Sequence, residues 1–169
     1  MAPDDVPEIM TALAPLLGAW SGTGEGQFPT IRPFRYREEL RFELDGERPL
    51  IHYEQRTSHC ELGTTSWVAS HWESGFLRPV GAHLVEMTNA QDGGRLEILR
   101  LSVERSSDGV RLAGESTAVI NDDRVAHTRR TLEVVGDVLT YEVRMGTTRV
   151  PAGALHLQAK LSRVAGGVR

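Results

Sequence analysis

The chain has 169 residues, a net charge of −4 and a hydrophobic fraction of 40%, values typical of one globular domain with a substantial core. The negative charge argues against general attraction to nucleic acid, although the basic residues are eighteen arginines and only Lys160. No stretch approaches the ~20 apolar residues that cross a bilayer, and the N-terminus lacks the basic and apolar regions of a signal peptide.

Cysteine content points to a reducing compartment. Cys60 is the only cysteine, so an internal disulfide is excluded, and we expect a cytoplasmic protein with neither a membrane nor a nucleic-acid partner. We place Cys60 in a polar loop and assign it no catalytic role. A single domain is expected over residues 1–169, with flexible ends at 1–6 and 165–169 and fraying from Arg163 onward.

One short helix is predicted over residues 7–17, where Pro7 suits the first turn and Pro15 limits the length. A tryptophan among glycines follows: Gly18, Trp20, Gly22, Gly24 and Gly26. Glycine is unfavourable inside a helix and marks bends or close approaches in a strand. We therefore predict a bent first strand on which Trp20 closes one end of a sheet, beside the helix.

The same glycines could be compared with a phosphate-binding loop. Residues 22–26 have the spacing G-x-G-x-G rather than G-x-G-x-x-G, and the next residues, Gln-Phe-Pro, do not open a helix. No βαβ pattern surrounds them. The sequence therefore does not predict a dinucleotide site.

From Phe34 onward, apolar and polar residues alternate, which is typical of half-buried strands. Tight-turn signals such as Asp45-Gly46 and Asp108-Gly109 separate the alternating segments. The expected strands are 34–44, 50–57, 64–73, 76–79 continuing with 82–88, 95–105, 110–120, 126–135, 138–145 and 154–164. About ten strands with almost no helix predict an all-β fold, an antiparallel up-and-down β-barrel of the calycin or lipocalin kind.

Candidate catalytic groups are sparse. The chain contains six histidines: His52, His59, His71, His83, His127 and His156. None lies at the short spacing of a metal cluster, and no serine lies in a nucleophile-elbow motif. The residues alone therefore indicate neither a metal cluster nor a nucleophilic hydrolase.

Four segments together indicate a family. They are Gly18-x-Trp20-x-Gly22-x-Gly24, Pro29-Thr30-Ile31-x-Pro33-Phe34-x-Tyr36, Glu73-Ser74-Gly75-Phe76-Leu77-Arg78, and the late His156. In these segments, and over almost its whole length, the chain resembles the nitrobindins, small haem-binding β-barrels. The resemblance implies one haem b per chain, isomerisation of peroxynitrite to nitrate at ferric haem, nitric oxide binding, and a monomer or homodimer.

The resemblance also implies roles for individual residues. His156 corresponds to the proximal ligand of the haem iron, and one histidine is enough because the porphyrin supplies four ligands. Thr30 and Ile31 would lie against the haem. His71 would act on the distal side, and its alternation with Trp67 and Ala69 points it inward.

Strict alternation conflicts with the role of His156. Leu155, Leu157, Ala159 and Leu161 form the apolar face of the last strand, which puts His156 on the opposite face. Either a β-bulge near Pro151 and Gly153 shifts the register, or the second face looks into the pocket.

A carrier is the alternative from another functional class. The same barrel could hold a fatty acid or another small apolar ligand, whose carboxylate would pair with an internal arginine such as Arg129 or Arg144. A barrel without a small ligand is a third possibility. The visible spectrum of protein made with haem precursor would separate these alternatives.

Overall fold

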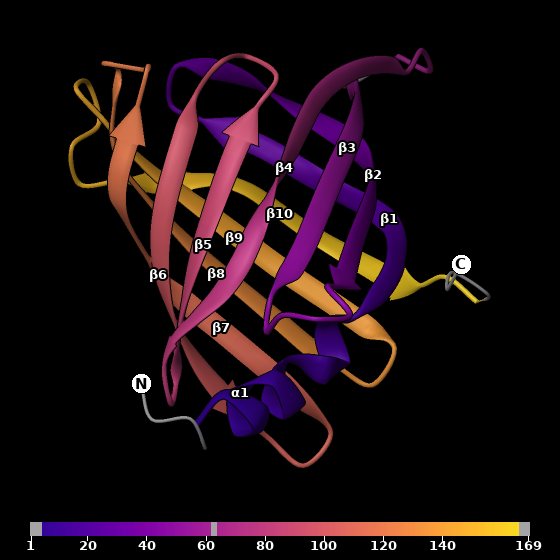
Figure 1. Ribbon diagram of the computed structural model, residues 1–169. Helices are drawn as coiled ribbons and strands as arrows, with labels where there is room; N and C mark the ends of the chain where they lie inside the picture. Colours follow the sequence, from indigo (N-terminus) through magenta and orange to yellow (C-terminus); the bar gives the residue numbers. More distant parts are fainter. Residues whose placement is uncertain (1–4, 62–63, 166–169) are drawn as a thin grey trace.

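A computed structural model describes residues 5–61 and 64–165. Within them, ten antiparallel strands close into a barrel, in which each strand pairs with its neighbours in sequence and β1 pairs with β10 (Figure 1). This confirms the predicted fold class. The strands are β1 (Gly18–Phe28), β2 (Ile31–Leu44), β3 (Ile51–Glu61), β4 (Val68–Gly81), β5 (Leu84–Gln91), β6 (Leu96–Arg105), β7 (Gly109–Ile120), β8 (Val125–Val135), β9 (Val138–Thr147) and β10 (Ala154–Arg163).

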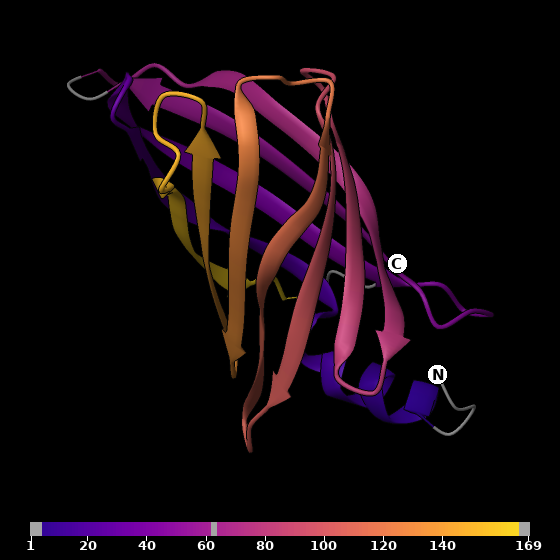
Figure 2. The same cartoon turned by 90° about the vertical axis from the view of Figure 1, so that its left-hand side faces the viewer.

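The two ends of the barrel differ. The helix α1 (Asp5–Leu13) and the 3₁₀ turn η1 (Ala14–Leu16) lie across one end, which we call the closed end (Figures 1 and 2). Because the strands alternate in direction, the turn at residues 29–30 and the turns after β5, β7 and β9 all lie at the opposite end, the mouth. Among the described residues, no helix has the length and apolar character needed to cross a membrane.

Trp20 is buried at the closed end. Its Nε1 donates a hydrogen bond to the Leu16 carbonyl at 2.8 Å, and the Arg163 guanidinium lies 4.1 Å from the ring centroid. Apolar side chains of the helical segment, including Leu13 and Leu16, belong to the same core cluster. The indole therefore joins the helix to the last strand of the barrel.

We expect Trp20→Phe to lower the free energy of unfolding by about 1–2 kcal/mol, because the buried Leu16 carbonyl loses its donor while most of the apolar surface remains. Urea unfolding measures the change. Trp72→Phe is the matched control, since Trp72 is exposed on the outer face and surface changes stay within about 0.5 kcal/mol. Equal effects of the two variants would contradict this role for Trp20.

The glycines of β1 make room for aromatic rings. A Cβ at Gly24 would lie 2.2 Å from Cζ of Tyr36, and one at Gly26 would lie 2.1 Å from Cζ of Phe34. Both partners come from β2, which pairs with β1. The alternating glycines thus let the Phe34 and Tyr36 rings lie against the strand, and no space for a phosphate group is needed to explain them.

Three local predictions are corrected. The segments predicted as 64–73 and 76–79 form one strand, β4, since Gly75 stays in the ladder opposite Tyr53. Cys60 is not in a loop but is buried in β3. Arg163 is not frayed, because its guanidinium donates hydrogen bonds to the Leu17 and Pro15 carbonyls at 2.7 and 3.0 Å. The ends predicted to be flexible lie largely outside the described residues.

Candidate functional site

A cavity of about 700 Å³ occupies the barrel interior. Near the mouth its lining includes Arg32, His71, Arg95 and His156; toward the closed end it includes Leu40, Phe42, Met87 and Leu132. This volume lies within the range of small-molecule and cofactor sites. The cavity therefore extends from the mouth into the apolar core.

His156 lies at a β-bulge. Along the β9–β10 ladder, Leu155 pairs with Arg144 and Leu157 with Val143, so His156 is an extra residue that opposes no partner. Both His156 and Leu157 consequently line the cavity. The expected bulge exists, but it falls at His156 itself and not near Pro151 and Gly153.

The imidazole of His156 is held by two contacts. Its Nδ1 lies 3.2 Å from the Gln27 carbonyl oxygen, and the Phe28 ring packs edge-on, with centroids 5.7 Å apart. Burial lowers the pKa of His156, opposed by the hydrogen bond to Gln27 and reinforced by the nearby Arg95 and His71. The ring is therefore neutral at pH 7, the form that can bind a metal ion.

The other three site residues predicted from the resemblance lie in different surroundings. His71 is half-buried and lines the cavity, with Nε2 3.3 Å from Glu73 Oε2 and Nδ1 3.6 Å from Asp92 Oδ1. Thr30 and Ile31 are exposed beside the mouth, and the adjacent residues 32–34 line the cavity in their place. The structure thus brings His71 and His156 to one cavity.

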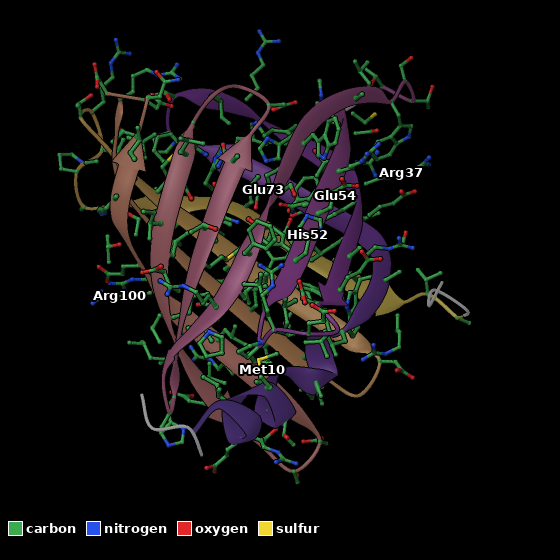
Figure 3. All side chains as sticks on the ribbon, viewed as in Figure 1. Met10, Arg37, His52, Glu54, Glu73 and Arg100 are labelled. Carbon is green, nitrogen blue, oxygen red and sulfur yellow. The ribbon has the colours of Figure 1, made fainter. Side chains whose placement is uncertain are left out.

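His71 points inward for a different reason from the predicted one. Along β3–β4, Thr57 pairs with His71 and Ser58 with Ala69, so Ser70 is an extra residue that changes the alternation. Trp67 lies outside, where the Arg37 guanidinium sits 4.1 Å from its ring centroid. In Figure 3, Arg37 likewise projects away from the barrel.

Polar side chains form a belt inside the barrel, which the sequence analysis missed and which we call the polar layer. It lies between the apolar floor and the mouth. Its members are Tyr36, Glu38, Tyr53, Gln55, Glu73, Asn89, Glu97, Thr128, Arg130 and Tyr141, all of them buried. Burying so many polar groups is tolerable only when they satisfy one another.

Arg130 is the cation of the polar layer. Its Nη1 donates to Glu73 Oε1 at 2.6 Å, and its Nη2 donates to Glu73 Oε2 and Glu97 Oε2, both at 3.1 Å. Burial acts to raise the pKa of Glu73, but the charge of Arg130 and hydrogen bonds from His71 and Arg130 hold it well below its usual range. The buried carboxylate is therefore ionised.

The internal arginine expected for a carrier is not Arg129 or Arg144, since both are exposed. In β8 the inward positions are 128, 130, 132 and 134, and in β9 they are 139, 141 and 143, so Arg129 and Arg144 face outward. Arg130 is internal instead, but two carboxylates already occupy its guanidinium. It is therefore poorly placed to pair with the carboxylate of a fatty acid.

Glu38 anchors the other half of the polar layer. Its Oε1 accepts a hydrogen bond from Gln55 Nε2 at 2.7 Å, and its Oε2 lies 2.5 Å from the Tyr141 hydroxyl. Burial raises the pKa of Glu38 from its usual 4.5 to about 7, although these hydrogen bonds oppose the rise. This carboxyl group therefore changes protonation near neutral pH.

We expect Glu38→Gln to stabilise the protein increasingly as the pH rises from 4.5 to 7. In that window the wild-type folded state keeps a proton that the unfolded chain has released, so wild-type stability falls with rising pH. At about 1.4 kcal/mol per pKa unit, the advantage should reach about 3 kcal/mol by pH 8. Urea unfolding at pH 5 and 8 tests this, with the exposed Glu39→Gln as control; a difference independent of pH would contradict it.

Comparison with known proteins identifies the family. Residues 9–163 match the model of the THAP4-like, heme-binding beta-barrel domain. The chain belongs to this family. A protein named peroxynitrite isomerase Rv2717c from Arabidopsis thaliana is 37% identical over 165 residues, covering 96% of this chain and 95% of that one. Peroxynitrite isomerase 1 of Rhodococcus jostii (strain RHA1) is 37% identical over 159 residues, covering 94% and 86%.

Solved structures agree with the family assignment. The crystal structure of Rv2717c from M. tuberculosis superposes with a TM-score of 0.82 at 31% identity, covering 97% of this chain and 99% of that one. The S-type phycobiliprotein lyase CPES from Guillardia theta has a TM-score of 0.62 at 8% identity, covering 96% of this chain and 97% of that one. The lyase therefore shares the fold alone.

The side chains that could donate to a metal ion in the cavity suit the haem of this heme-binding family. Among the described residues, no group of three or more histidine, cysteine, aspartate or glutamate side chains could hold a metal ion. A porphyrin supplies four iron ligands itself and needs only an axial one. His156 offers a neutral imidazole for that position, and Phe34, Val143 and Leu157 line the cavity with apolar surface.

Proposed function

We propose that the protein binds one haem b per chain through His156 and acts as a peroxynitrite isomerase that also binds nitric oxide. The observation that carries this proposal is the β-bulge that places the imidazole of His156 on the wall of a cavity of about 700 Å³. The names of the relatives support the activity, and the lone buried Cys60 supports a reducing, cytoplasmic location.

When bound in its ferric form, haem supplies an iron centre for conversion of peroxynitrite to nitrate. The chain's own residues have simpler tasks in this proposal. His156 would hold the iron, and the apolar wall of Phe34, Val143 and Leu157 would exclude water from the macrocycle. Ile31, exposed beside the mouth, and Thr30 would cover the part of the macrocycle nearest to solvent.

His71 and Arg95 would set the polarity of the cavity. Both lie near enough to His156 to influence its pKa, and both line the cavity. Arg95 carries a positive charge and His71 carries one when it is protonated, so each can attract an anionic ligand. Neither residue needs to move a proton for an isomerisation, in which the atoms of the reactant are those of the product.

Reconstitution tests the proposal. Purified protein is titrated with ferric haem while the Soret band is recorded, and peroxynitrite decay and nitrate yield are then compared for loaded protein, haem-free protein and free haem. We expect one haem per chain, faster decay and more nitrate only in the loaded protein. Failure to bind haem would overturn the proposal, whereas haem binding without faster decay would overturn its enzymatic part.

A further inference from the structure

The strands around His156 depart from regular pairing on both sides of the imidazole. His156 is the extra residue of the β9–β10 bulge. On the neighbouring β1, the pairing with β2 shifts between Gly26 and Phe28, so that Gln27 faces two residues, Arg32 and Pro33. The β1–β10 ladder ends at the Gly26–Leu157 pair, immediately beside both irregularities.

These irregularities leave a backbone carbonyl available to a side chain. The Gln27 carbonyl oxygen lies 3.2 Å from His156 Nδ1. A carbonyl oxygen can only accept a hydrogen bond, so Nδ1 must carry the imidazole proton. The lone pair of the ring is then on Nε2, for which no hydrogen bond is found among the described residues.

Phe28, the next residue, restricts rotation of the ring. It is 7% exposed and meets His156 edge-on, at an interplanar angle of 84°. Turning the imidazole over would lose the bond to Gln27. The adjacent residues of β1 therefore fix the ring in two ways, one through hydrogen bonding and the other through packing.

We infer that Gln27, through its carbonyl, and Phe28, through its ring, are positioning residues that hold His156 as the Nδ1–H tautomer and leave Nε2 to bind iron. The part that concerns iron rests on the proposed function, whereas the tautomer does not. Partners of this kind orient metal-binding histidines, and their loss typically costs about 10–100-fold in metal affinity.

The tautomer can be measured without haem. A long-range ¹H–¹⁵N correlation spectrum of the wild-type haem-free protein, assigned with His156→Gln and His127→Gln, distinguishes the two tautomers of each ring. We expect Nδ1–H for His156. His127 provides an internal control with the opposite expectation, since its Nε2 lies 3.3 Å from the Pro151 carbonyl. An Nε2–H form or an equal mixture at His156 would overturn the inference.

Variants test the positioning itself. Phe28→Ala should give mixed tautomers and about 10-fold weaker haem binding, with a shifted iron–histidine vibration in the ferrous protein, and Phe28→Leu should recover part of the affinity. Because Gln27→Ala keeps the backbone carbonyl, His156 should stay in the Nδ1–H tautomer in that variant. Phe76→Ala is the matched control, because Phe76 packs against His52 on the outer face, with centroids 5.4 Å apart.

The outcomes separate the two proposals. Unchanged haem affinity and vibration in Phe28→Ala would overturn the role of Phe28. If wild-type protein binds no haem, the proposed function fails while the tautomer assignment is judged from the correlation spectrum alone. If haem binds but His156 is an Nε2–H tautomer, the proposed function stands and the positioning inference fails.

Discussion

Replacing Arg130 with methionine should lower the free energy of unfolding by about 3–5 kcal/mol at pH 8, the usual cost of removing one partner of a buried ion pair. The variant leaves Glu73 and Glu97, which are 2% and 1% exposed, without their shared cation. Methionine has a similar length and no charge. The loss of stability therefore comes mainly from the missing cation and not from an empty cavity. Urea unfolding monitored by circular dichroism measures it.

The dependence of this loss on pH identifies its cause. In wild type, Arg130 holds the pKa of Glu73 low, a contribution that is present above the unfolded pKa and lost as the pH falls. Without Arg130, burial should raise the pKa of Glu73, so protonation of this carboxylate relieves its buried charge and the loss of stability should shrink toward pH 5. A loss of equal size at both pH values would point to packing instead.

Arg129→Met is the matched control for Arg130→Met. Arg129 is the preceding residue on β8, but it is exposed and pairs with Glu115 on the outer face. Exposed pairs contribute less than about 1 kcal/mol. Combining Arg130→Met with Glu73→Gln should recover part of the stability, because it removes the charge of one of the two buried carboxylates that lose Arg130, while Glu97 keeps its ion pair with Arg95.

The barrel could be predicted from the sequence because its signals are local. Alternation within each strand and turn residues between strands set ten antiparallel segments in chain order, and the structure pairs them in that order. Only the pairing of β1 with β10, which closes the barrel, is long-range. It could be expected only from the general rule that closure of a sheet removes its unpaired edge strands. The boundaries of β3 and β4 were less accurate because no strong turn signal marks them.

The polar layer was missed although alternation contains it. Glu38 lies between Tyr36 and Leu40 in the two-residue period of β2, and Arg130 has the same parity as Leu132 and Val134 in β8. Because only apolar residues were expected to point inward, the inward positions of Glu38 and Arg130 were not predicted. Arg129 was considered in place of Arg130. A charged residue on the apolar parity of a barrel strand is therefore a signal for an internal ion pair.

The position of His156 could not be obtained from alternation. A β-bulge adds one residue to one strand and reverses the parity on one side of it, and neither β10 nor β4 carries a local signal that distinguishes the extra residue. His156 and Ser70 are both such residues. The family resemblance pointed to His156 and His71 as candidates, whereas the contacts of Gln27 and Phe28 with His156 depend on how β1 and β10 lie together in the barrel.

We expect His156→Ala to weaken ferric haem binding by more than about 100-fold, since loss of an outer partner alone costs about 10–100-fold in metal affinity. Alanine removes the one side chain proposed to bond to iron and leaves the apolar wall of Phe34, Val143 and Leu157 in place. Some haem could stay by burial, so residual colour does not decide the question. The Soret and charge-transfer bands of the haem-loaded protein decide it, and nitric oxide binding and peroxynitrite decay are measured in parallel.

His71→Ala is the informative comparison, because His71 lines the same cavity but is proposed to act through polarity and not through a bond to iron. It should keep the iron–histidine spectrum and change only the rates of nitric oxide binding and peroxynitrite decay. Loss of the spectrum in His71→Ala, with His156→Ala unchanged, would reverse the assignment of the two histidines. Loss in both variants would indicate that both histidines bind the iron, which would contradict a site that peroxynitrite can reach.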